Sequence, residues 1–412
     1  MKAPAYSLGL LLVIYIVNNV DRQIMNILVE PIKKDLGLSD GQIGWLIGGS
    51  FALFYTVAGL PIARLADRAN RRNIISVALL VWSAMTMLCG MARSFPQLLA
   101  ARIGVGVGEA GCTPPAHSMI SDTFPTAKRA SAISIYSLGG PIGMLFGLAF
   151  GGYLADQLGW QAAFMVVGAP GLLLAAITRF TLDEPVRGGF DAQGDRAIEP
   201  VGTTLRFIAA LPAIRHMLAG SAVQTLFLAG VAAFHSSYLV RVHGMSVTRA
   251  GIWLGLIAGV AGGISVYTSG LFADRLGRRD LRWHYWLAAV GNLVSLPFSV
   301  LAYTAEDGTM AVLWLAIATL GNHQYSALGH AVLQGLVKPR MRAVMSATAL
   351  FAMNAVGFGV GPVVVGELSD YFGGGVELRK ALLALIVFMF WAATHFLLGA
   401  RTYLRDLEAK NA

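Results

Sequence analysis

The sequence predicts an all-α membrane protein with 12 transmembrane helices, built as two six-helix halves related by pseudo-two-fold symmetry. Three observations predict this architecture: an apolar composition, twelve apolar segments of membrane-spanning length, and a charged loop that occurs twice. Of the 412 residues, 56% are hydrophobic and 13% are charged, whereas a soluble domain usually carries about 25% charged residues. This composition excludes an ordinary soluble enzyme, a disordered chain and a disulfide scaffold.

Each apolar segment is long enough to cross a bilayer, which takes about 20 apolar residues in a helix. An open sheet would leave its edge groups unpaired in lipid, and a barrel needs polarity that alternates at every second residue, which these segments lack. The segments are therefore predicted to be helices. They run approximately over 6–29, 42–66, 73–92, 96–121, 129–156, 160–180, 214–240, 249–273, 283–303, 310–336, 343–368 and 378–400.

The distribution of Lys and Arg predicts the topology. If the chain starts in the cytoplasm, cytoplasmic segments hold 22 of the 31 basic residues, outer loops hold 7, and Arg22 and Arg102 lie within apolar segments. By the positive-inside rule, we expect a multi-pass protein of the plasma (inner) membrane with both termini in the cytoplasm. The first apolar segment is too long for a cleavable signal peptide. The net charge of +9 lies in short loops, so the expected partner is a membrane surface and no nucleic acid.

A polar interruption at 182–204 divides the predicted helices into two groups of six. Its prolines, glycines and charges are typical of a linker, and the residues just after it predict a short amphipathic helix on the inner membrane face. The predicted domains are an N-terminal six-helix bundle over 1–181, a cytoplasmic linker with the short helix over 182–211, and a C-terminal six-helix bundle over 212–412.

Internal repetition supports this division. Asp67-Arg68-Ala69-Asn70-Arg71-Arg72 follows the second predicted helix, and Asp274-Arg275-Leu276-Gly277-Arg278-Arg279 follows the eighth. Gly140-Pro141 in the fifth helix is echoed by Gly361-Pro362 in the eleventh, and a proline there removes a helical hydrogen bond and permits bending. Parallel repeats of six helices are a transporter architecture, with the substrate site near mid-membrane.

The charged residues of the two loops are expected to form a cytoplasmic gate. Aspartate and arginine can pair across the seam between helices and lock one face of a transporter. The alternative is that the loops are only positive-inside anchors, which the duplication disfavours. The predicted gate residues are Asp67, Arg68, Arg71, Arg72, Asp274, Arg275, Arg278 and Arg279.

Four charges fall well within the predicted membrane: Asp21 and Arg22 in the first helix, and Arg102 and Glu109 in the fourth. Buried charges cost roughly 2.5–3.5 kcal/mol each on insertion scales, so they normally face a cavity and pair. The helical rise predicts that Asp21 and Arg102 lie at similar depth and that Glu109 lies nearer the membrane centre. We therefore expect Asp21 to have arginine partners, with Arg22 a possible partner for either carboxylate, and Glu109 to be the main proton site. A permanent structural ion-pair network is the alternative.

Polar and aromatic side chains of the predicted helices are candidates for the lining of a substrate cavity. Each could equally hydrogen-bond a neighbouring helix, and the aromatic side chains could face lipid. The cavity candidates are Asn18, Asn19, His117, Gln224, Phe227, Tyr238, Asn322, Tyr325, Phe351 and Asn354.

Other residue patterns predict packing and no cofactor. The glycines at 104, 106, 108 and 111 predict close helix packing, because no strand precedes them as a dinucleotide-binding loop would require. Cys89 and Cys112 are predicted to be buried, reduced packing residues. The histidines lack metal-ligand spacing, so we expect no metal, no cofactor beyond a coupling proton, and a monomer.

The charged loop at 67–72 and its repeat at 274–279 resemble the signature of the major facilitator superfamily, which implies the major facilitator fold. The N-terminal half also resembles the Spinster family in four motifs: Asn19-Val20-Asp21-Arg22, Asp67-Arg68-Ala69-Asn70-Arg71, the run from Arg102 to Ala110, and Glu184-Pro185-Val186-Arg187-Gly188. Asn70 is informative because the wider superfamily usually has glycine there. The chain resembles a short, bacterial-type member of that family.

The Spinster resemblance implies a transporter of sphingosine-1-phosphate or lysophospholipids, with proton coupling as in some relatives. We therefore expect a secondary active transporter that moves an amphipathic lipid by alternating access, with proton coupling through Asp21 and Glu109. The nearest alternative is a superfamily transporter of a small organic anion or sugar that uses the same arginines. An intramembrane enzyme that modifies lipid is a weaker alternative, because the duplicated loops favour transport.

Overall fold

The computed structural model describes residues 4–66, 68–188 and 199–411, and these residues form helices, turns and loops without strands. The chain divides into two compact units. Unit 1 comprises Met1–Gly194, Phe234–Val240 and Gly244–Gly259, and unit 2 comprises Asp195–Ala233, Arg241–His243 and Val260–Ala412. The predicted C-terminal bundle includes residues 234–240 and 244–259, which belong to unit 1 in the structure. The predicted halves describe a repeat in the sequence, whereas the units are defined by compactness, so the division into halves stays a prediction.

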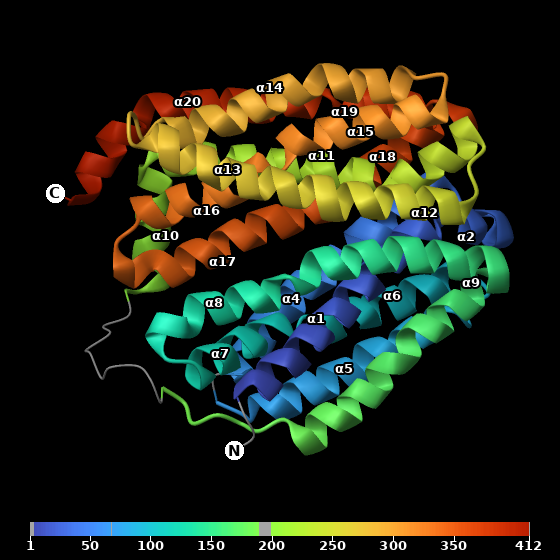
Figure 1. The fold of residues 1–412 in the computed structure, drawn as a ribbon, viewed down its shortest axis with the longest axis horizontal. Helices are drawn as coiled ribbons and strands as arrows, with labels where there is room; N and C mark the ends of the chain where they lie inside the picture. Colours follow the sequence, from blue (N-terminus) through green and yellow to red (C-terminus); the bar gives the residue numbers. More distant parts are fainter. Residues whose placement is uncertain (1–3, 67, 189–198, 412) are drawn as a thin grey trace. The chain divides into compact units, whose positions relative to one another are not determined.

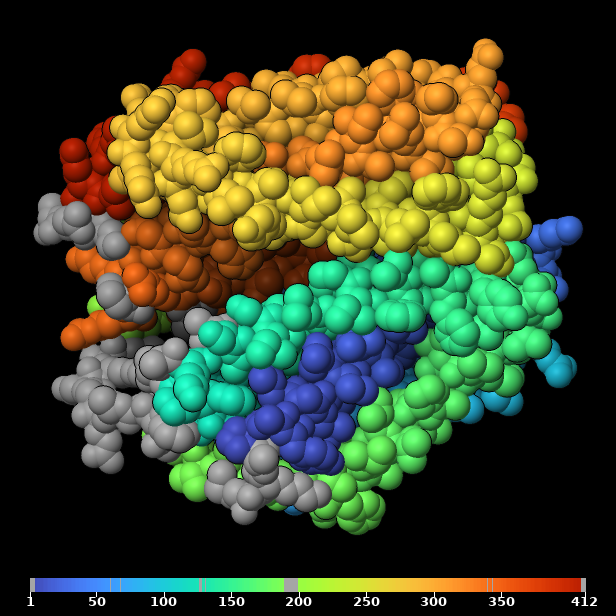
Figure 2. Space-filling model, viewed as in Figure 1, coloured from blue at the N-terminus to red at the C-terminus, as the bar shows by residue number. Residues whose placement is uncertain are grey.

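Unit 1 is a bundle in which α1, α5 and α12 each pack along α9, and α6 packs between α4 and α5 (Figure 1). Figure 2 shows α8 and the adjoining part of α9 beside α1 on one surface of this unit. Its elements are α1 (Pro4–Ile27), α2 (Val29–Leu36), α3 (Asp40–Gly44), the π-helical segment η1 (Trp45–Gly49), α4 (Ser50–Ala66), α5 (Arg71–Cys89), α6 (Phe95–Glu109), α7 (Thr113–Thr123), α8 (Thr126–Ser137), α9 (Gly139–Thr181) and α12 (Val247–Leu256).

Unit 2 is centred on α14, which packs against α15 and α20 (Figure 1). The long helix α11 (Pro212–His243) belongs mainly to this unit, and its residues Phe234–Val240 belong to unit 1. The π-helical η2 (Ile257–Ala261) contains the boundary between the units, after Gly259. The other elements of unit 2 are α10 (Val201–Ala210), α13 (Gly262–Gly277), α14 (Trp283–Thr304), α15 (Gly308–Asn322), α16 (Gln324–Leu336), the 3-10 segment η3 (Pro339–Met341), α17 (Arg342–Ala352), the π-helical η4 (Met353–Phe358), α18 (Gly359–Tyr371), the 3-10 segment η5 (Gly375–Glu377), α19 (Leu378–Leu385) and α20 (Val387–Asn411).

The described helices account for the twelve predicted spans. Nine helical stretches are long and apolar enough to cross a membrane. One of them, Ser131–Thr181, holds two spans, because Gly159 adopts φ 83° and ψ 162° and turns the chain, a conformation open essentially only to glycine. The predicted segments 96–121 and 310–336 are each present as two shorter helices in succession, α6 with α7 and α15 with α16. The chain is therefore a multi-pass membrane protein.

Local side-chain caps explain where several helices begin. Ser39 and Gln42 form a capping box at the start of α3, with Gln42 N donating to Ser39 Oγ at 3.2 Å and Ser39 N donating to Gln42 Oε1 at 3.0 Å. Asn70 caps α5, because its Oδ1 accepts from Asn73 N at 3.0 Å. An N-cap of this kind stabilises a helix by about 1 kcal/mol relative to alanine, which gives the asparagine in the duplicated loop a structural role.

The glycines of α6 allow the close packing that their spacing predicts. A Cβ on Gly108 would lie 2.7 Å from Trp82 N and 2.8 Å from Trp82 Cβ on α5. A Cβ on Gly104 would instead lie 2.6 Å from Met85 Cγ, which belongs to a flexible side chain. Backbone cannot move aside as a methionine can, so the two glycines differ in how much a methyl group would cost.

We expect Gly108→Ala to lower the stability of the protein by about 1–3 kcal/mol, as overpacking of a close contact does. Gly104→Ala is the matched control on the same helix, and it should cost less because Met85 can change rotamer. Thermal unfolding midpoints of both variants, purified in the same detergent, measure the difference. Equal midpoints for the two variants would show that α5 and α6 do not approach each other as closely as Gly108 and Trp82 indicate.

Candidate functional site

The four charges predicted within the membrane come together inside unit 1. Arg22 on α1 donates from Nε to Oε2 of Glu109 on α6, at 2.5 Å. The side chain of Arg22 is 31% exposed, whereas Glu109 is completely buried. Asp21 and Arg102 are buried as well, at 1% and 2% exposed. One ion pair therefore joins α1 to α6, with two further buried charges beside it.

Two aromatic rings of α4 line the arginines. The Cζ atom of Arg22 lies 4.9 Å from the ring centroid of Tyr55 and 5.4 Å from that of Phe51. Arg102 Cζ lies 5.3 Å from the Phe51 centroid. Rings stacked on a guanidinium stabilise its charge, so α4 helps to hold both cations. Sequence reasoning missed both aromatic residues, whose only signal was their spacing of one helical turn.

Asp21 differs from Glu109, because neither of its carboxylate oxygens has a hydrogen-bond partner among the described residues. The charges that act on it are those of Glu109 and Arg102, and the hydroxyl nearby is that of Thr86 on α5. The side-chain atoms of Asn18, one turn earlier on α1, and the Thr86 hydroxyl are also buried and form no hydrogen bond of ordinary length and angle with another described residue, although Asn18 acts on Glu109 and Thr86 acts on Asp21. The site thus contains a group of buried polar atoms with unused hydrogen-bonding capacity.

This geometry corrects the expected pairing. The sequence favoured Asp21 as the partner of the arginines and left Arg22 open as a partner for either carboxylate, whereas Arg22 binds Glu109 and the oxygens of Asp21 have no hydrogen-bond partner among the described residues. The physical reason is the helical turn: successive residues of a helix point about 100° apart, so neighbours in sequence do not face each other. Depth along the axis was therefore a poor guide to which charges meet.

The remaining cavity candidates of unit 1 lie in different surroundings. Asn19 donates from Nδ2 to the carbonyl oxygen of Tyr15 at 2.8 Å, within its own helix. The His117 ring stands edge-on to Tyr136, with centroids 5.2 Å apart, and Tyr136 stacks on Tyr15 at 4.6 Å. Tyr238 is fully buried. Asn18 is therefore the candidate of this group that lies with the charges, since Glu109 interacts with it.

In unit 2 the structure brings Gln224 and Asn322 into one buried polar cluster. Gln224 Nε2 donates to the carbonyl oxygen of Asn322 at 3.2 Å, and its Oε1 accepts from Asn292 Nδ2 at 2.7 Å. Asn322 ends α15, so this bond satisfies a carbonyl at the break before α16. Beside this cluster, the hydroxyl of Thr225, which follows Gln224 on α11, lies 2.9 Å from the hydroxyl of Tyr325 near the start of α16. Gln224 and Tyr325 thus each form a hydrogen bond with a neighbouring helix, and their place in a substrate cavity stays a prediction.

Three further candidates do not join this cluster. Phe227 is buried at 1% exposed, whereas Phe351 is 57% exposed. Asn354 donates to the carbonyl oxygen of Leu350 in its own helix at 2.9 Å. Asn292 and Thr225 are polar residues of the cluster that sequence reasoning missed, because a single polar residue in an apolar helix gives no sign of its partner.

The first copy of the charged loop is held by Arg71, which is 1% exposed. Arg71 donates from Nε to Glu184 Oε1 at 2.7 Å and from Nη1 to Ser118 Oγ at 2.7 Å, and it forms an ion pair with Asp122. The backbone N of Arg72 donates to Glu184 Oε2 at 3.0 Å. Arg71 therefore joins the start of α5 to α7 and to the segment after α9. Asp67 lies outside the described residues.

The second copy is organised differently. Asp274, Arg275, Arg278 and Arg279 are exposed, and none of them forms an ion pair with another described residue. The nearby acid, Asp280, is bound by Arg282 instead, at 2.7 Å between Oδ2 and Nη2. Hydrogen bonds from Arg282 lower the pKa of Asp280 below its ordinary value. The two copies, which share the pattern of one aspartate and three arginines, therefore differ in structure.

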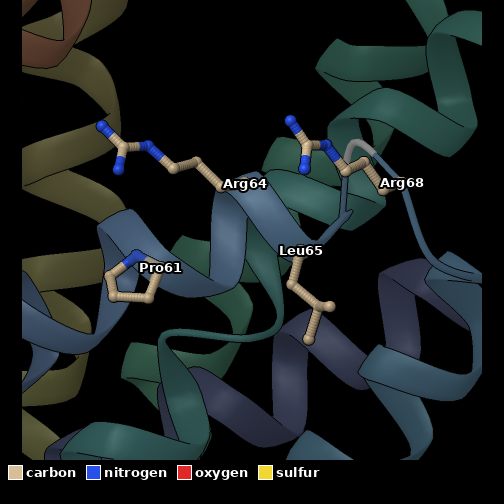
Figure 3. A pocket seen from close by; sticks show the side chains of 4 residues that line it. All are labelled: Pro61, Arg64, Leu65 and Arg68. Carbon is tan, nitrogen blue, oxygen red and sulfur yellow. The ribbon is translucent and has the colours of Figure 1, made fainter.

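Arg64 and Arg68 line an open pocket of about 630 Å³ with Pro61 and Leu65. Figure 3 shows both arginine side chains directed to the same side of α4, away from Leu65. Neither arginine forms an ion pair with any residue that the structure describes. Two guanidinium groups one turn apart favour an anion between them.

The two Gly-Pro pairs lie at irregular points of their helices. Gly140 and Pro141 fall in the first turn of α9, directly after the interruption at Leu138. Gly361 and Pro362 fall in the first turn of α18, after the π-helical η4. Bending of the two helices at these points stays a prediction. In the described part of the chain, no group of three His, Cys, Asp or Glu could hold a metal ion.

An all-helical chain with twelve spans, a duplicated charged loop and charges buried between helices defines a membrane transporter. The family model of the Major Facilitator Superfamily matches residues 11–362, and the chain belongs to this superfamily. Transporters of this family are not enzymes and need no cofactor.

Individual relatives refine this assignment. An MFS-type efflux pump of Mycolicibacterium smegmatis (strain ATCC 700084 / mc(2)155) is 36% identical over 406 residues, which cover 97% of this chain and 94% of that protein. A crystal structure of a bacterial homolog to the human lysosomal transporter Spinster, in an inward-facing and occupied conformation, matches with a TM-score of 0.90 at 32% identity and covers 98% of both chains. The probable galactarate/D-glucarate transporter of Bacillus subtilis (strain 168) is 26% identical over 388 residues, covering 87% of this chain and 84% of that protein. The resemblance to the Spinster family is confirmed.

Proposed function

We propose that the protein is a proton-coupled transporter that moves an amphipathic anionic lipid, such as a lysophospholipid or a sphingosine-1-phosphate-like molecule, by alternating access. It acts in the plasma (inner) membrane with both termini in the cytoplasm. The observation that most supports the proposal is the site of unit 1, where the ion pair of Arg22 with the buried Glu109 lies beside Asp21, a buried carboxyl group whose oxygens have no hydrogen-bond partner among the described residues.

Arg22 supplies the anion-binding group. Its ion pair with Glu109 uses Nε, and Tyr55 also acts on the guanidinium. The phosphate of a head group would replace Tyr55 at the terminal nitrogens, and arginine binds phosphate through such paired donors. Phe51 and Tyr55 beside it offer apolar surface to the first carbons of a chain. A ligand with an anionic head and an apolar chain satisfies both features.

Asp21 supplies the proton-binding group. Burial of an unpaired carboxylate costs far more than burial of its neutral acid, whereas the ion pair with Arg22 offsets that cost at Glu109. We therefore assign the exchangeable proton to Asp21 and a permanent charge to Glu109. Head-group binding at Arg22 weakens its hold on Glu109, and the charge of Glu109 acts on Asp21. Substrate and proton are coupled through this chain of three side chains.

The charged loops act as the gate at the cytoplasmic face. In the first copy, Arg71 holds the starts and ends of three segments of unit 1 together. In the second copy the arginines are exposed and without acidic partners among the described residues, so they are available to acidic groups when the transporter changes state. The gate then consists of one permanent clamp and one exchangeable cluster.

A small organic anion, such as a sugar acid, is the second candidate substrate. It is favoured by the relative that transports galactarate or D-glucarate, and the same arginines would bind its carboxylates. A sugar acid has no apolar chain, so it would make no use of the aromatic residues beside Arg22. The two candidates therefore differ in whether an apolar chain contributes to binding.

We expect a lysophospholipid to raise the thermal unfolding midpoint of the purified protein, because a ligand of the folded state stabilises it by about 2.7 kcal/mol at one hundred times its Kd. A monoacylglycerol of the same chain length controls for the detergent-like action of the lipid, and it should produce no rise because it lacks the phosphate. Galactarate should likewise produce none. A rise with galactarate and none with any lysophospholipid would assign the protein to the second candidate.

A further inference from the structure

Two histidines meet in unit 2, far along the sequence from each other. His216 lies in the second turn of α11, and His395 lies on α20. Their Nδ1 atoms are 3.0 Å apart, and the ring centroids are 5.3 Å apart. Trp391, one turn before His395, donates from Nε1 to His395 Nε2 at 3.0 Å. Neither histidine has a role in the proposed transport cycle.

The donor and acceptor roles in these contacts determine which ring nitrogens carry a hydrogen. An indole N–H only donates, so His395 Nε2 accepts and carries no hydrogen. Neutral His395 then carries its hydrogen on Nδ1 and donates it to Nδ1 of His216, which accepts. The hydrogen of His216 lies on Nε2. The chain from Trp391 through His395 to His216 is therefore complete only when both rings are neutral.

The two histidines lie beside a junction of three helices. Ala213 N donates to Asp406 Oδ2 on α20 at 2.8 Å, and Tyr285 on α14 donates to the carbonyl oxygen of Ala213 at 2.7 Å. Tyr285 and Tyr403 pack with ring centroids 5.2 Å apart. These bonds hold the first turn of α11, and the histidine pair holds the next turn to α20.

The charged and titratable groups around the pair are accounted for. Arg215 acts on His216, and His216 acts on His395. Asp406 is engaged by Ala213 N and by Arg405, whose Nη2 lies 2.9 Å from Asp406 Oδ1. Among the residues that the structure describes, no carboxylate acts on either ring, so a positive charge on a histidine has no acidic partner among them.

We propose that His216 and His395 form a pH-dependent clasp between α11 and α20. A proton added to His216 at Nδ1 places two N–H donors face to face, and a proton added to His395 at Nε2 removes the acceptor of Trp391. Either proton also adds a positive charge close to Arg215. The clasp is closed when both rings are neutral and opens on acidification, in the pH range where histidine titrates.

Opening would release the start of α11, which follows α10 and the predicted linker. The clasp is independent of the proposed proton site, since Asp21 lies in unit 1. It would adjust the protein to the pH of its surroundings whether or not a proton is transported. This inference therefore goes beyond the proposed function and does not rest on it.

Hydrogen exchange at residues 212–220 and 391–399 tests the clasp, with the wild type and the His216→Gln/His395→Gln variant compared at pH 7.5 and at pH 5.5. Glutamine can maintain a hydrogen bond across the helices but does not titrate. Because the closed clasp excludes the proton, the open population should rise by about tenfold one pH unit below the ordinary histidine pKa. We expect local opening in the wild type to rise by that factor relative to the variant. Equal changes in the two proteins would overturn the proposal.

Trp391→Phe provides a second test that leaves both histidines in place. Without the indole donor the tautomer of His395 is no longer determined, so the clasp should already be weaker at pH 7.5 and should respond less to acid. His284→Gln is the matched control, because the His284 ring bonds only to Leu281 of its own turn, at 2.9 Å. Unchanged exchange in Trp391→Phe, or the same effect in His284→Gln, would contradict the clasp.

Discussion

Asp21→Asn is expected to abolish accumulation of the substrate in response to a pH gradient. Asparagine keeps the shape of the side chain but cannot bind and release a proton. A gradient of one pH unit supplies about 1.4 kcal/mol per proton, which supports about a tenfold accumulation ratio. In proteoliposomes with such a gradient, the wild type should approach that ratio, and Asp21→Asn should stay near one. The measurement is uptake of a labelled substrate identified by the thermal-shift screen.

Glu109→Gln is the informative comparison for this experiment. It removes the anion that pairs with Arg22 and leaves a guanidinium whose side chain is 31% exposed without that partner. Breaking a fully buried pair typically costs about 3–5 kcal/mol, and the partial exposure of Arg22 makes the cost smaller. We expect this variant to lose stability and transport at every pH, whereas Asp21→Asn should keep the fold and the binding of the substrate. If Glu109→Gln remained stable and lost only its response to the gradient, the roles of the two carboxyl groups would be the reverse of those assigned here.

Arg71→Met is expected to be strongly destabilising, by about 3–5 kcal/mol, because it leaves Asp122 and Glu184 partly buried without their cation. Both carboxylates are largely shielded, with 10% and 22% of their side chains exposed. The loss should appear as a lower thermal unfolding midpoint and as weaker protection of the segment around Glu184 from proteolysis.

Arg278→Met is the matched control, because Arg278 is the residue of the second loop that corresponds to Arg71. Arg278 is exposed and has no acidic partner among the described residues, and surface charges of this kind contribute about 0–1 kcal/mol. Arg72→Met is a control within the first loop, since the Arg72 side chain makes only a 3.4 Å contact with Asn73. Equal losses of stability in Arg71→Met and Arg278→Met would contradict the conclusion that only the first loop is held by a buried arginine.

The fold was largely predictable from the sequence because lipid imposes one requirement on every span. In the bilayer, the backbone N–H and C=O groups of a chain must form hydrogen bonds with one another, so apolar segments of sufficient length become helices. The interruption of the predicted segment 96–121 between α6 and α7 was not predictable in the same way. Pro114 and Pro115 stand at the start of α7, but a proline within a span can equally produce a kink without ending the helix.

The sequence was enough to predict which charged residues form the site, but not which arginine pairs with which carboxylate. Asp21, Arg22, Arg102 and Glu109 stood out because charges within apolar segments are costly and therefore rare. Which arginine meets which carboxylate depends on the rotation of α1 against α6, and the sequence carries no measure of that angle. The aromatic partners on α4 and the histidine pair of unit 2 depend on contacts between helices distant in sequence, so single residues gave no sign of them.

Direct detection of proton movement during substrate transport tests the proposal that Asp21 couples the two. Proteoliposomes that contain a pH-sensitive dye, with no imposed gradient, are exposed to the lysophospholipid that stabilises the purified protein. We predict that the internal pH changes when the wild type transports the lipid and that Asp21→Asn produces no change while still binding the lipid. Transport by the wild type without any change in internal pH, or a change that persists in Asp21→Asn, would contradict coupling through this carboxyl group.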